Sequence, residues 1–258
     1  MRTNWVRERL RAGKPAIGCF LSLGSPNLAE LMAHVGYDFL VIETEHNGLD
    51  SAEIQHMLMA MNGTEVIPIV RVPSSQPTFI QRALDMGALG VLVPLIKTAD
   101  EARAVVQATR YPPVGTRGFG PLRASNYTLD YEDYYNRAND NIIVSFILET
   151  KEAVENLAEI AAVPGVDALY VGTFDLCISL GLNPMRQPHP EIEAIVDRAV
   201  AIGRETGVAI GLGTGTPDGL RQLQARGLTY LVYGTDALLV SAAAKAGIDT
   251  FDREAFAR

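Results

Sequence analysis

Cysteines and long apolar runs are scarce in this chain. It has two cysteines in 258 residues, Cys19 and Cys177, which is too few for a disulfide framework, and their spacing is not that of a metal site. They are expected to be buried free thiols in a reducing cytoplasm. No apolar run approaches the ~20 residues of a membrane-spanning helix, so no membrane partner is expected. The N-terminal segment is basic without an apolar core, so we expect a short helix before the first strand rather than a secretory peptide.

Positive charge is also in short supply. The formal net charge is −8 and the isoelectric point is about 5.1, and the sequence contains no block of lysine or arginine. Nucleic acids and anionic membranes are therefore poor candidates for a partner. An acidic protein that binds a small anionic molecule needs local positive charge, which a metal ion together with an arginine could supply.

Strand and helix patterns alternate along the whole chain. Apolar, β-rich runs lie near 16–22, 38–43, 66–71, 89–95, 142–149, 167–172, 208–213 and 229–233. Helical patterns lie near 26–35, 51–61, 76–86, 98–109, 151–162, 189–206, 216–226 and about 235–246. This alternation predicts a (β/α)₈ barrel, and the length suits one such domain over residues 1–258.

The most informative stretch is the βαβ unit at 142–175. A buried strand ends at Glu149, a helix follows, and the next strand is followed by Asp175. Because a crossover helix makes the two strands parallel, both carboxylates should lie at the same end of the sheet. Such a pair suits Mg²⁺ or Mn²⁺, which keep their remaining positions for water or substrate. The alternative is that Asp175 simply begins a helix around 176–180.

The second and third strands add further polar groups at the same end. Strand two runs into Glu43, Glu45 and His46, and a histidine beside carboxylates can act as an acid or base near neutral pH. Arg71 follows strand three and can hold a carboxylate or stabilise a developing oxyanion. The alternatives are a solvated surface turn for the histidine and an ion pair with Glu43 or Glu45 for the arginine.

Two glycine-rich stretches have no defined role. The stretch YPPVGTRGFGPLRAS at 111–125 is either a substrate-facing loop or a long connection. The segment GLGTGT at 211–216 is a candidate phosphate site because barrels often bind phosphate after strands seven and eight, although it has no basic residue of its own.

Taken together, these features resemble the HpcH/HpaI aldolase family over nearly the whole chain. The shared features, in chain order, are Glu45-His46, Arg71, the turn 84–87, Val93-Pro94, the segment 99–102, the loop 111–120, Glu149-Thr150, Gly172 with Asp175, and His189-Pro190. The resemblance implies a TIM barrel of the phosphoenolpyruvate/pyruvate-domain type. It also implies a class II aldolase that reversibly cleaves a 4-hydroxy-2-oxo acid into an aldehyde and pyruvate, or a related acid such as hydroxypyruvate, through a metal-stabilised enolate.

The resemblance also implies roles for individual residues. Glu149 and Asp175 would hold the metal, which is Mg²⁺ or Mn²⁺, with Co²⁺ or Zn²⁺ as alternatives. His46 would be the acid/base, Glu43 would support it, and Asp85 would increase its basicity, either within one chain or across a subunit interface. Arg71 would stabilise the enolate. Gly172 and the backbone at Phe174 would bind the substrate carboxylate. The family commonly forms hexamers built as trimers of dimers, so a homo-oligomer is expected.

This chain departs from the family pattern at three places, which affects the substrate more than the reaction class. Glu43 replaces an aspartate, Ile147 replaces a glutamine, and Thr173-Phe174 replaces Pro-Ala or Pro-Gly. A bulky ring therefore lies beside the site and one polar substrate contact is missing.

Three other functions stay open. A class I aldolase needs a desolvated lysine, and of Lys14, Lys97, Lys151 and Lys245 only Lys97 lies near the catalytic end of a strand. A lyase that acts on malyl- or citramalyl-CoA would share the barrel and the metal. A non-catalytic 2-oxo-acid binding protein would share the pocket alone.

Overall fold

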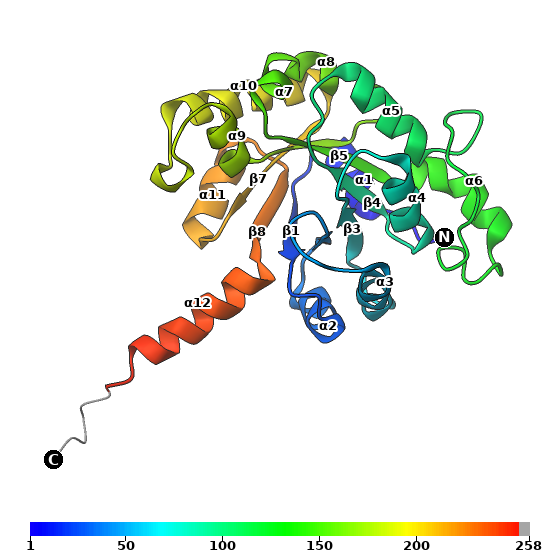
Figure 1. The fold of residues 1–258 in the computed structure, drawn as a ribbon, viewed down its shortest axis with the longest axis horizontal. Helices are drawn as coiled ribbons and strands as arrows, with labels where there is room; N and C mark the ends of the chain where they lie inside the picture. The colour runs from blue at the N-terminus through cyan, green and yellow to red at the C-terminus, as the bar shows by residue number, and fades with distance from the viewer. Residues whose placement is uncertain (253–258) are drawn as a thin grey trace.

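The computed structural model, which describes residues 1–252, is a closed barrel of eight parallel strands (Figure 1). Each strand pairs with the next in the sequence, and the eighth pairs with the first. The strands are β1 (Ala16–Leu21), β2 (Phe39–Glu43), β3 (Ile67–Arg71), β4 (Gly90–Val93), β5 (Ile143–Leu148), β6 (Ala168–Val171), β7 (Ala209–Thr214) and β8 (Tyr230–Thr235). The predicted (β/α)₈ barrel is confirmed.

Helices connect the strands around the outside of the barrel. They are α1 (Trp5–Arg11), α2 (Pro26–Val35), α3 (Ser51–Ala60), α4 (Pro77–Asp85), α5 (Ala99–Thr109), α6 (Tyr131–Asn141), α7 (Lys151–Glu155), α8 (Leu157–Ala161), α9 (Thr173–Ser179), the 3₁₀ turn η1 (Pro184–Arg186), α10 (Pro190–Thr206), α11 (Pro217–Arg226) and α12 (Asp236–Asp249). Within residues 1–252, no helix is both long enough and apolar enough to cross a membrane.

Two helical regions differ from the sequence prediction. The predicted helix at 151–162 is broken at Asn156, which ends α7 and precedes α8. The Asn156 side chain donates a hydrogen bond to the Lys97 carbonyl at 2.9 Å, and this contact ties the break to the loop after β4. The helix α6 was not predicted, because its sequence is mostly polar.

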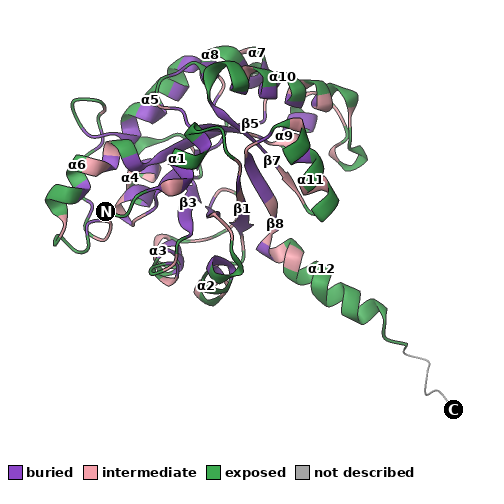
Figure 2. Ribbon diagram, turned by 180° about the vertical axis from the view of Figure 1, so that it is seen from behind, coloured by how far each residue is buried: buried purple, intermediate pink, exposed green. Residues whose placement is uncertain are grey.

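The apolar residues form an inner and an outer core. Inside the barrel, Phe39 stacks on Tyr230 with ring centroids 4.6 Å apart, and branched side chains such as Ile67 and Ile143 fill the space around them. The outer core lies between the strands and the helices, and Figure 2 shows the strands buried beneath helices whose outer faces are exposed. The filled lower barrel leaves space only toward the carboxyl ends of the strands.

A buried ion cluster joins α1 to the amino ends of the strands. Asp167, just before β6, accepts hydrogen bonds from Arg7 Nε at 3.0 Å, Arg11 Nε at 3.0 Å and the Val144 amide at 3.0 Å. A third arginine, Arg110, lies 4.0 Å away, and burial lowers its pKa to about 10. The Asp167 carboxylate therefore compensates several buried cations.

The last helix, α12, leaves the barrel instead of packing on it (Figure 1). Its first residue, Asp236, is buried and accepts hydrogen bonds from the Ser22 hydroxyl at 2.7 Å and the Leu23 amide at 3.1 Å. Figure 2 shows the rest of the helix almost entirely exposed, including Val240 and Ile248.

We predict that Asp167→Asn lowers the free energy of unfolding by about 3–5 kcal/mol, because it leaves buried arginines without their counter-charge. Urea denaturation followed by circular dichroism measures this. The control is Asp100→Asn, which removes an exposed carboxylate paired with Arg103 and should change stability by less than about 0.5 kcal/mol. Equal stability of the two variants would contradict the assigned role of Asp167.

Candidate active site

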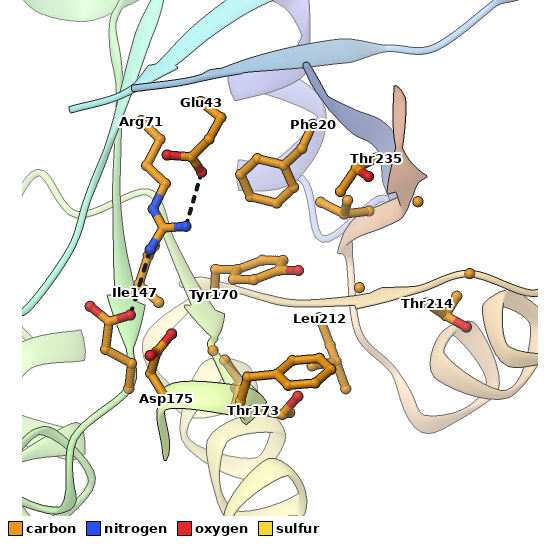
Figure 3. Close-up of a pocket in the computed structure, with 18 of the residues that line it drawn as sticks. Phe20, Glu43, Arg71, Ile147, Tyr170, Thr173, Asp175, Leu212, Thr214 and Thr235 are labelled. Atoms are coloured by element: carbon orange, nitrogen blue, oxygen red, sulfur yellow. Dashed lines mark hydrogen bonds and ion pairs between the residues drawn. The ribbon is translucent and has the colours of Figure 1, made fainter. Parts of the chain in front are cut away.

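The barrel register brings the polar strand ends together. Glu43 ends β2 directly opposite Arg71, which ends β3. Leu148 of β5 pairs with Val171 of β6, so Glu149 and Gly172 follow side by side. These residues line one cavity of about 460 Å³ at the carboxyl ends of the strands (Figure 3).

Arg71 lies at the centre of the charged side of this cavity. Its guanidinium donates a hydrogen bond to Glu43 Oε2 at 3.0 Å and is ion-paired with Glu45. Its Nη2 is also 3.7 Å from Glu149 Oε2. Because the side chain is buried, these charges interact with little screening by solvent.

Glu43 orders the turn that carries His46. Its Oε1 accepts hydrogen bonds from the backbone amides of Glu45 at 2.6 Å and His46 at 3.1 Å. The imidazole itself is 58% exposed, with Nε2 3.3 Å from Arg71 Nη2 and 3.6 Å from Glu45 Oε2. The Glu43 side chain thus contacts the backbone of His46, whereas the imidazole ring of His46 contacts Arg71 and Glu45.

Glu149 is a buried carboxylate whose negative charge is not fully balanced by its neighbours. Burial is the main cause that raises its pKa, to about 7, while a hydrogen bond from the Leu95 amide and the charge of Arg71 act in the opposite direction. The Leu95 amide is 2.7 Å from Glu149 Oε1, and Leu95 adopts a left-handed backbone conformation with φ of 59°. The loop after β4 is therefore held against this carboxylate.

Asp175 reaches the same cavity from the first turn of α9 (Figure 3). Its charge raises the pKa of both Glu149 and Glu45, which places it within electrostatic reach of both. Gly172 precedes the helix, and a Cβ there would lie 2.9 Å from Ile147. The first helical amides, at 173–175, have no carbonyl one turn earlier to accept them, so they can bind an anion in the cavity.

Glu149 and Asp175 could hold a divalent cation. Both offer hard oxygen donors, and the raised pKa of Glu149 shows a buried anion that a cation would stabilise. Within residues 1–252, no group of three or more His, Cys, Asp or Glu side chains is arranged to hold a metal. The fit is therefore to an ion that takes two protein carboxylates and completes its coordination with water or substrate.

Asp85 and Lys97 lie away from this cavity. Asp85 ends α4, which returns toward the amino ends of the strands, and its Oδ1 accepts a hydrogen bond from Arg117 Nη2 at 2.6 Å. Of the lysines in residues 1–252, none lines the cavity. The chain alone therefore does not bring Asp85 to His46 or place a lysine beside the carboxylates.

The ion pair of Arg71 with Glu43 or Glu45, given as the alternative for the arginine, is present with both carboxylates. Two other residues of the site had no assigned role in the sequence interpretation. Leu95 acts through its backbone amide, which leaves no signal in the sequence. Tyr170 lines the cavity from β6, where alternation along a four-residue strand is too short to show its direction.

The protein is a (β/α)₈ barrel with a polar cavity at the carboxyl ends of its strands. Barrel enzymes place their chemistry at this end, so the fold and the cavity are those of a barrel enzyme. The model of the HpcH/HpaI aldolase/citrate lyase family matches residues 16–250, so the chain belongs to that family, as the sequence resemblance predicted.

Similar proteins span nearly the full chain. A 2-dehydro-3,6-dideoxy-6-sulfogluconate aldolase of Pseudomonas putida is 38% identical over 239 residues, which cover 91% of this chain and 92% of that protein. A 2-keto-3-deoxy-L-rhamnonate aldolase of Escherichia coli is 37% identical over 241 residues, which cover 93% of this chain and 90% of that protein. The crystal structure of an HpcH/HpaI aldolase/citrate lyase family protein from Burkholderia cenocepacia has a TM-score of 0.90 and 37% identity, covering 96% of this chain and 98% of that one.

We predict that Mn²⁺ raises the melting temperature of the protein and that Glu149→Gln abolishes this shift, because the amide removes one anionic donor. Glu149 must lose its proton to bind the ion, so the apparent affinity should fall by up to about tenfold per pH unit below the Glu149 pKa of about 7. Differential scanning fluorimetry with Mn²⁺ at several pH values measures both effects. The control Glu152→Gln changes an exposed carboxylate on α7. An undiminished shift in Glu149→Gln would exclude this carboxylate as a ligand.

Proposed function

We propose that the protein is a divalent-metal-dependent aldolase that cleaves a 4-hydroxy-2-oxo acid into a 2-oxo acid of the pyruvate type and an aldehyde. Its relatives over most of the chain are named aldolases, which places the chain among carbon–carbon lyases. The single observation that carries the metal-dependent reaction is that buried Glu149 and Arg71 and exposed Asp175 line one cavity, with Arg71 3.7 Å from Glu149.

The residues of the cavity divide the reaction between them. When bound by Glu149 and Asp175, Mg²⁺ or Mn²⁺ (or Co²⁺ or Zn²⁺) would supply Lewis acidity toward the keto oxygen. Arg71 donates hydrogen bonds to the same oxygen as negative charge develops on it. The amides at Gly172 to Phe174 hold the substrate carboxylate.

His46 takes the proton of the 4-hydroxyl group. Its ring is exposed and lies 3.3 Å from Arg71, which lines the cavity, and its backbone is held by Glu43. As the proton leaves, the C3–C4 bond breaks and its electron pair moves toward the 2-oxo acid, so the aldehyde departs. Glu45 contacts both Arg71 and the imidazole, which suits it to position the two groups relative to each other.

The rival functions have less support in the structure. A Schiff-base aldolase needs a lysine in the cavity, and among the described residues the lining contains none. A thioester lyase needs room and cations for a nucleotide, whereas Arg71 is the one basic residue of the described lining. A non-catalytic binding protein would not need a histidine held beside the arginine.

We expect purified protein to release pyruvate from a 4-hydroxy-2-oxo acid, to lose this activity with EDTA and to regain it with Mg²⁺ or Mn²⁺. His46→Ala should lower kcat by about 10²–10⁴-fold, the usual contribution of an acid/base group, while Mn²⁺ still raises the melting temperature. His56→Ala, on the exposed face of α3, is the matched control. EDTA-resistant activity that borohydride and pyruvate abolish would instead support the Schiff-base reaction.

We further propose that the protein acts as a homo-oligomer, a hexamer by its resemblance to the family, in a reducing cytoplasm. Asp85 can increase the basicity of a histidine only if that histidine belongs to another copy of the chain. The projecting α12 and the exposed Phe119 and Leu129 supply apolar surface for such contacts. The compartment is supported by Cys19 and Cys177, which are both buried free thiols.

Light scattering should therefore give a mass of about six times the 27.9 kDa of one chain. Val240→Glu on α12 should reduce that mass, because it places a charge in the middle of the helix, whereas Met185→Glu, at an exposed apolar residue of η1, should not. A monomer that is fully active would contradict both the oligomer and the role of Asp85.

A further inference from the structure

The cavity has an uncharged half opposite its carboxylates. Glu43, Arg71, Glu149 and Asp175 all lie on one side. The other side is lined from β1, β7, β8 and the start of α12 by Phe20, Ser22, Leu212, Thr214, Thr235 and Leu238. No charged side chain of the described residues lines this half, and Figure 3 shows Phe20, Leu212 and Thr235 gathered there.

Most hydroxyl groups of this half already serve the fold. The Ser22 hydroxyl donates to Asp236 at 2.7 Å, and Thr235 Oγ1 accepts from the Leu238 amide to cap α12. Thr214 Oγ1 accepts from the Thr216 amide, and Thr216 Oγ1 caps α11 through Gly219. A molecule in this half therefore meets a mainly apolar wall.

Tyr170 is the exception. Its ring packs against Phe20, with centroids 5.9 Å apart and planes at 78°, and its hydroxyl points toward the side where Leu212 and Thr235 lie (Figure 3). Among residues 1–252 this hydroxyl has no hydrogen-bond partner. Burial raises the Tyr170 pKa and outweighs the charge of Arg71, which acts in the opposite direction, so the group stays protonated near neutral pH and can both donate and accept.

The strand β7 is shaped around this ring. A Cβ at Gly213 would lie 2.5 Å from the Tyr170 hydroxyl. A Cβ at Gly211 would lie 2.5 Å from the Tyr230 carbonyl oxygen and 3.1 Å from the Tyr170 ring. Gly213 thus leaves room for Tyr170, and Gly211 leaves room for both tyrosines. The segment has this packing role in the structure, and no cation of the described lining stands beside it for a phosphate.

We propose that Tyr170 is a specificity-determining residue and that its hydroxyl binds a hydroxyl group of a neutral, hydroxylated aldehyde. This inference rests on the proposed aldolase function and concerns the aldehyde half of the same site. A carboxylate or phosphate at that end would be desolvated without a counter-charge, because Arg71 is already held by Glu43 and Glu45 on the opposite side.

The preference for a hydroxyl follows from the same desolvation argument. An apolar aldehyde would cover the Tyr170 hydroxyl and leave it without water or a partner, which is costly. A hydroxylated aldehyde restores the hydrogen bond. Sites built to bind a substrate hydroxyl discriminate strongly against analogues that lack it.

The test is addition of pyruvate to three aldehydes with Mn²⁺ present, with kcat/KM measured for each. Glyceraldehyde carries hydroxyls, propanal has the same carbon chain without them, and succinic semialdehyde has a carboxylate at its far end. We expect glyceraldehyde to exceed propanal by about tenfold or more and succinic semialdehyde to be the poorest. Tyr170→Phe should lower the glyceraldehyde-to-propanal ratio by about tenfold.

The matched control is Tyr230→Phe, which removes a hydroxyl from a buried tyrosine that does not line the cavity. It should keep the wild-type ratio. A ratio unchanged in Tyr170→Phe, an equal fall in Tyr230→Phe, or a preference for succinic semialdehyde would each overturn the inference.

Exchange of the pyruvate methyl protons with D₂O separates this inference from the proposed function, because it needs no aldehyde. Metal-dependent exchange together with an unaltered ratio would leave the aldolase function standing and remove the role of Tyr170. Absence of both exchange and addition in the wild-type protein would overturn the aldolase function, and this inference with it.

Discussion

The guanidinium of Arg71 is the contact on which the charged half of the cavity depends. It bridges Glu43 and Glu45 from strand two and lies 3.7 Å from Glu149 after strand five. One cation does not balance these carboxylates together with Asp175, and the pKa values of Glu149 and Glu45 are both raised, mainly by burial. The arrangement is thus ordered by an arginine but still favours one more positive charge, which is the electrostatic basis for a divalent ion.

The sequence was sufficient to predict the barrel and the rim on which this charge cluster lies. Eight buried strands alternating with helices admit few closed arrangements, and parallel strands place Glu149 and Asp175 at one end whatever their side-chain contacts are. The same logic placed His46 and Arg71. The ion pair of Arg71 with Glu43 or Glu45 could be predicted only as an alternative, because such a contact depends on the register that sets Glu43 opposite Arg71. A shift of one residue would turn both side chains to the other face.

Contacts between segments far apart in the sequence could not be predicted for a different reason. The mostly polar helix α6 depends on tertiary contacts of its few buried residues, such as that of Tyr134 with Arg117. The local sequence of α12 does not predict that this helix projects from the barrel, since the sequence is as apolar as that of a packed helix. Asp85 shows the same limit, because its own chain pairs it with Arg117 and keeps it from His46.

The two ends of the barrel show how stability and function are separated in this fold. At the amino ends, the buried Asp167 carboxylate pairs with Arg7 and Arg11 and lies 4.0 Å from Arg110, so it has close cationic partners within the protein. At the carboxyl ends, Glu149 and the Tyr170 hydroxyl are left without full compensation inside a cavity. Such groups cost stability in the free protein, and ligands that satisfy them recover it as binding free energy. The uncharged wall comes mainly from β1, β7 and β8, whereas Glu43 and Arg71 end β2 and β3. Substitutions in that wall can therefore change the aldehyde without disturbing Arg71 and its carboxylates.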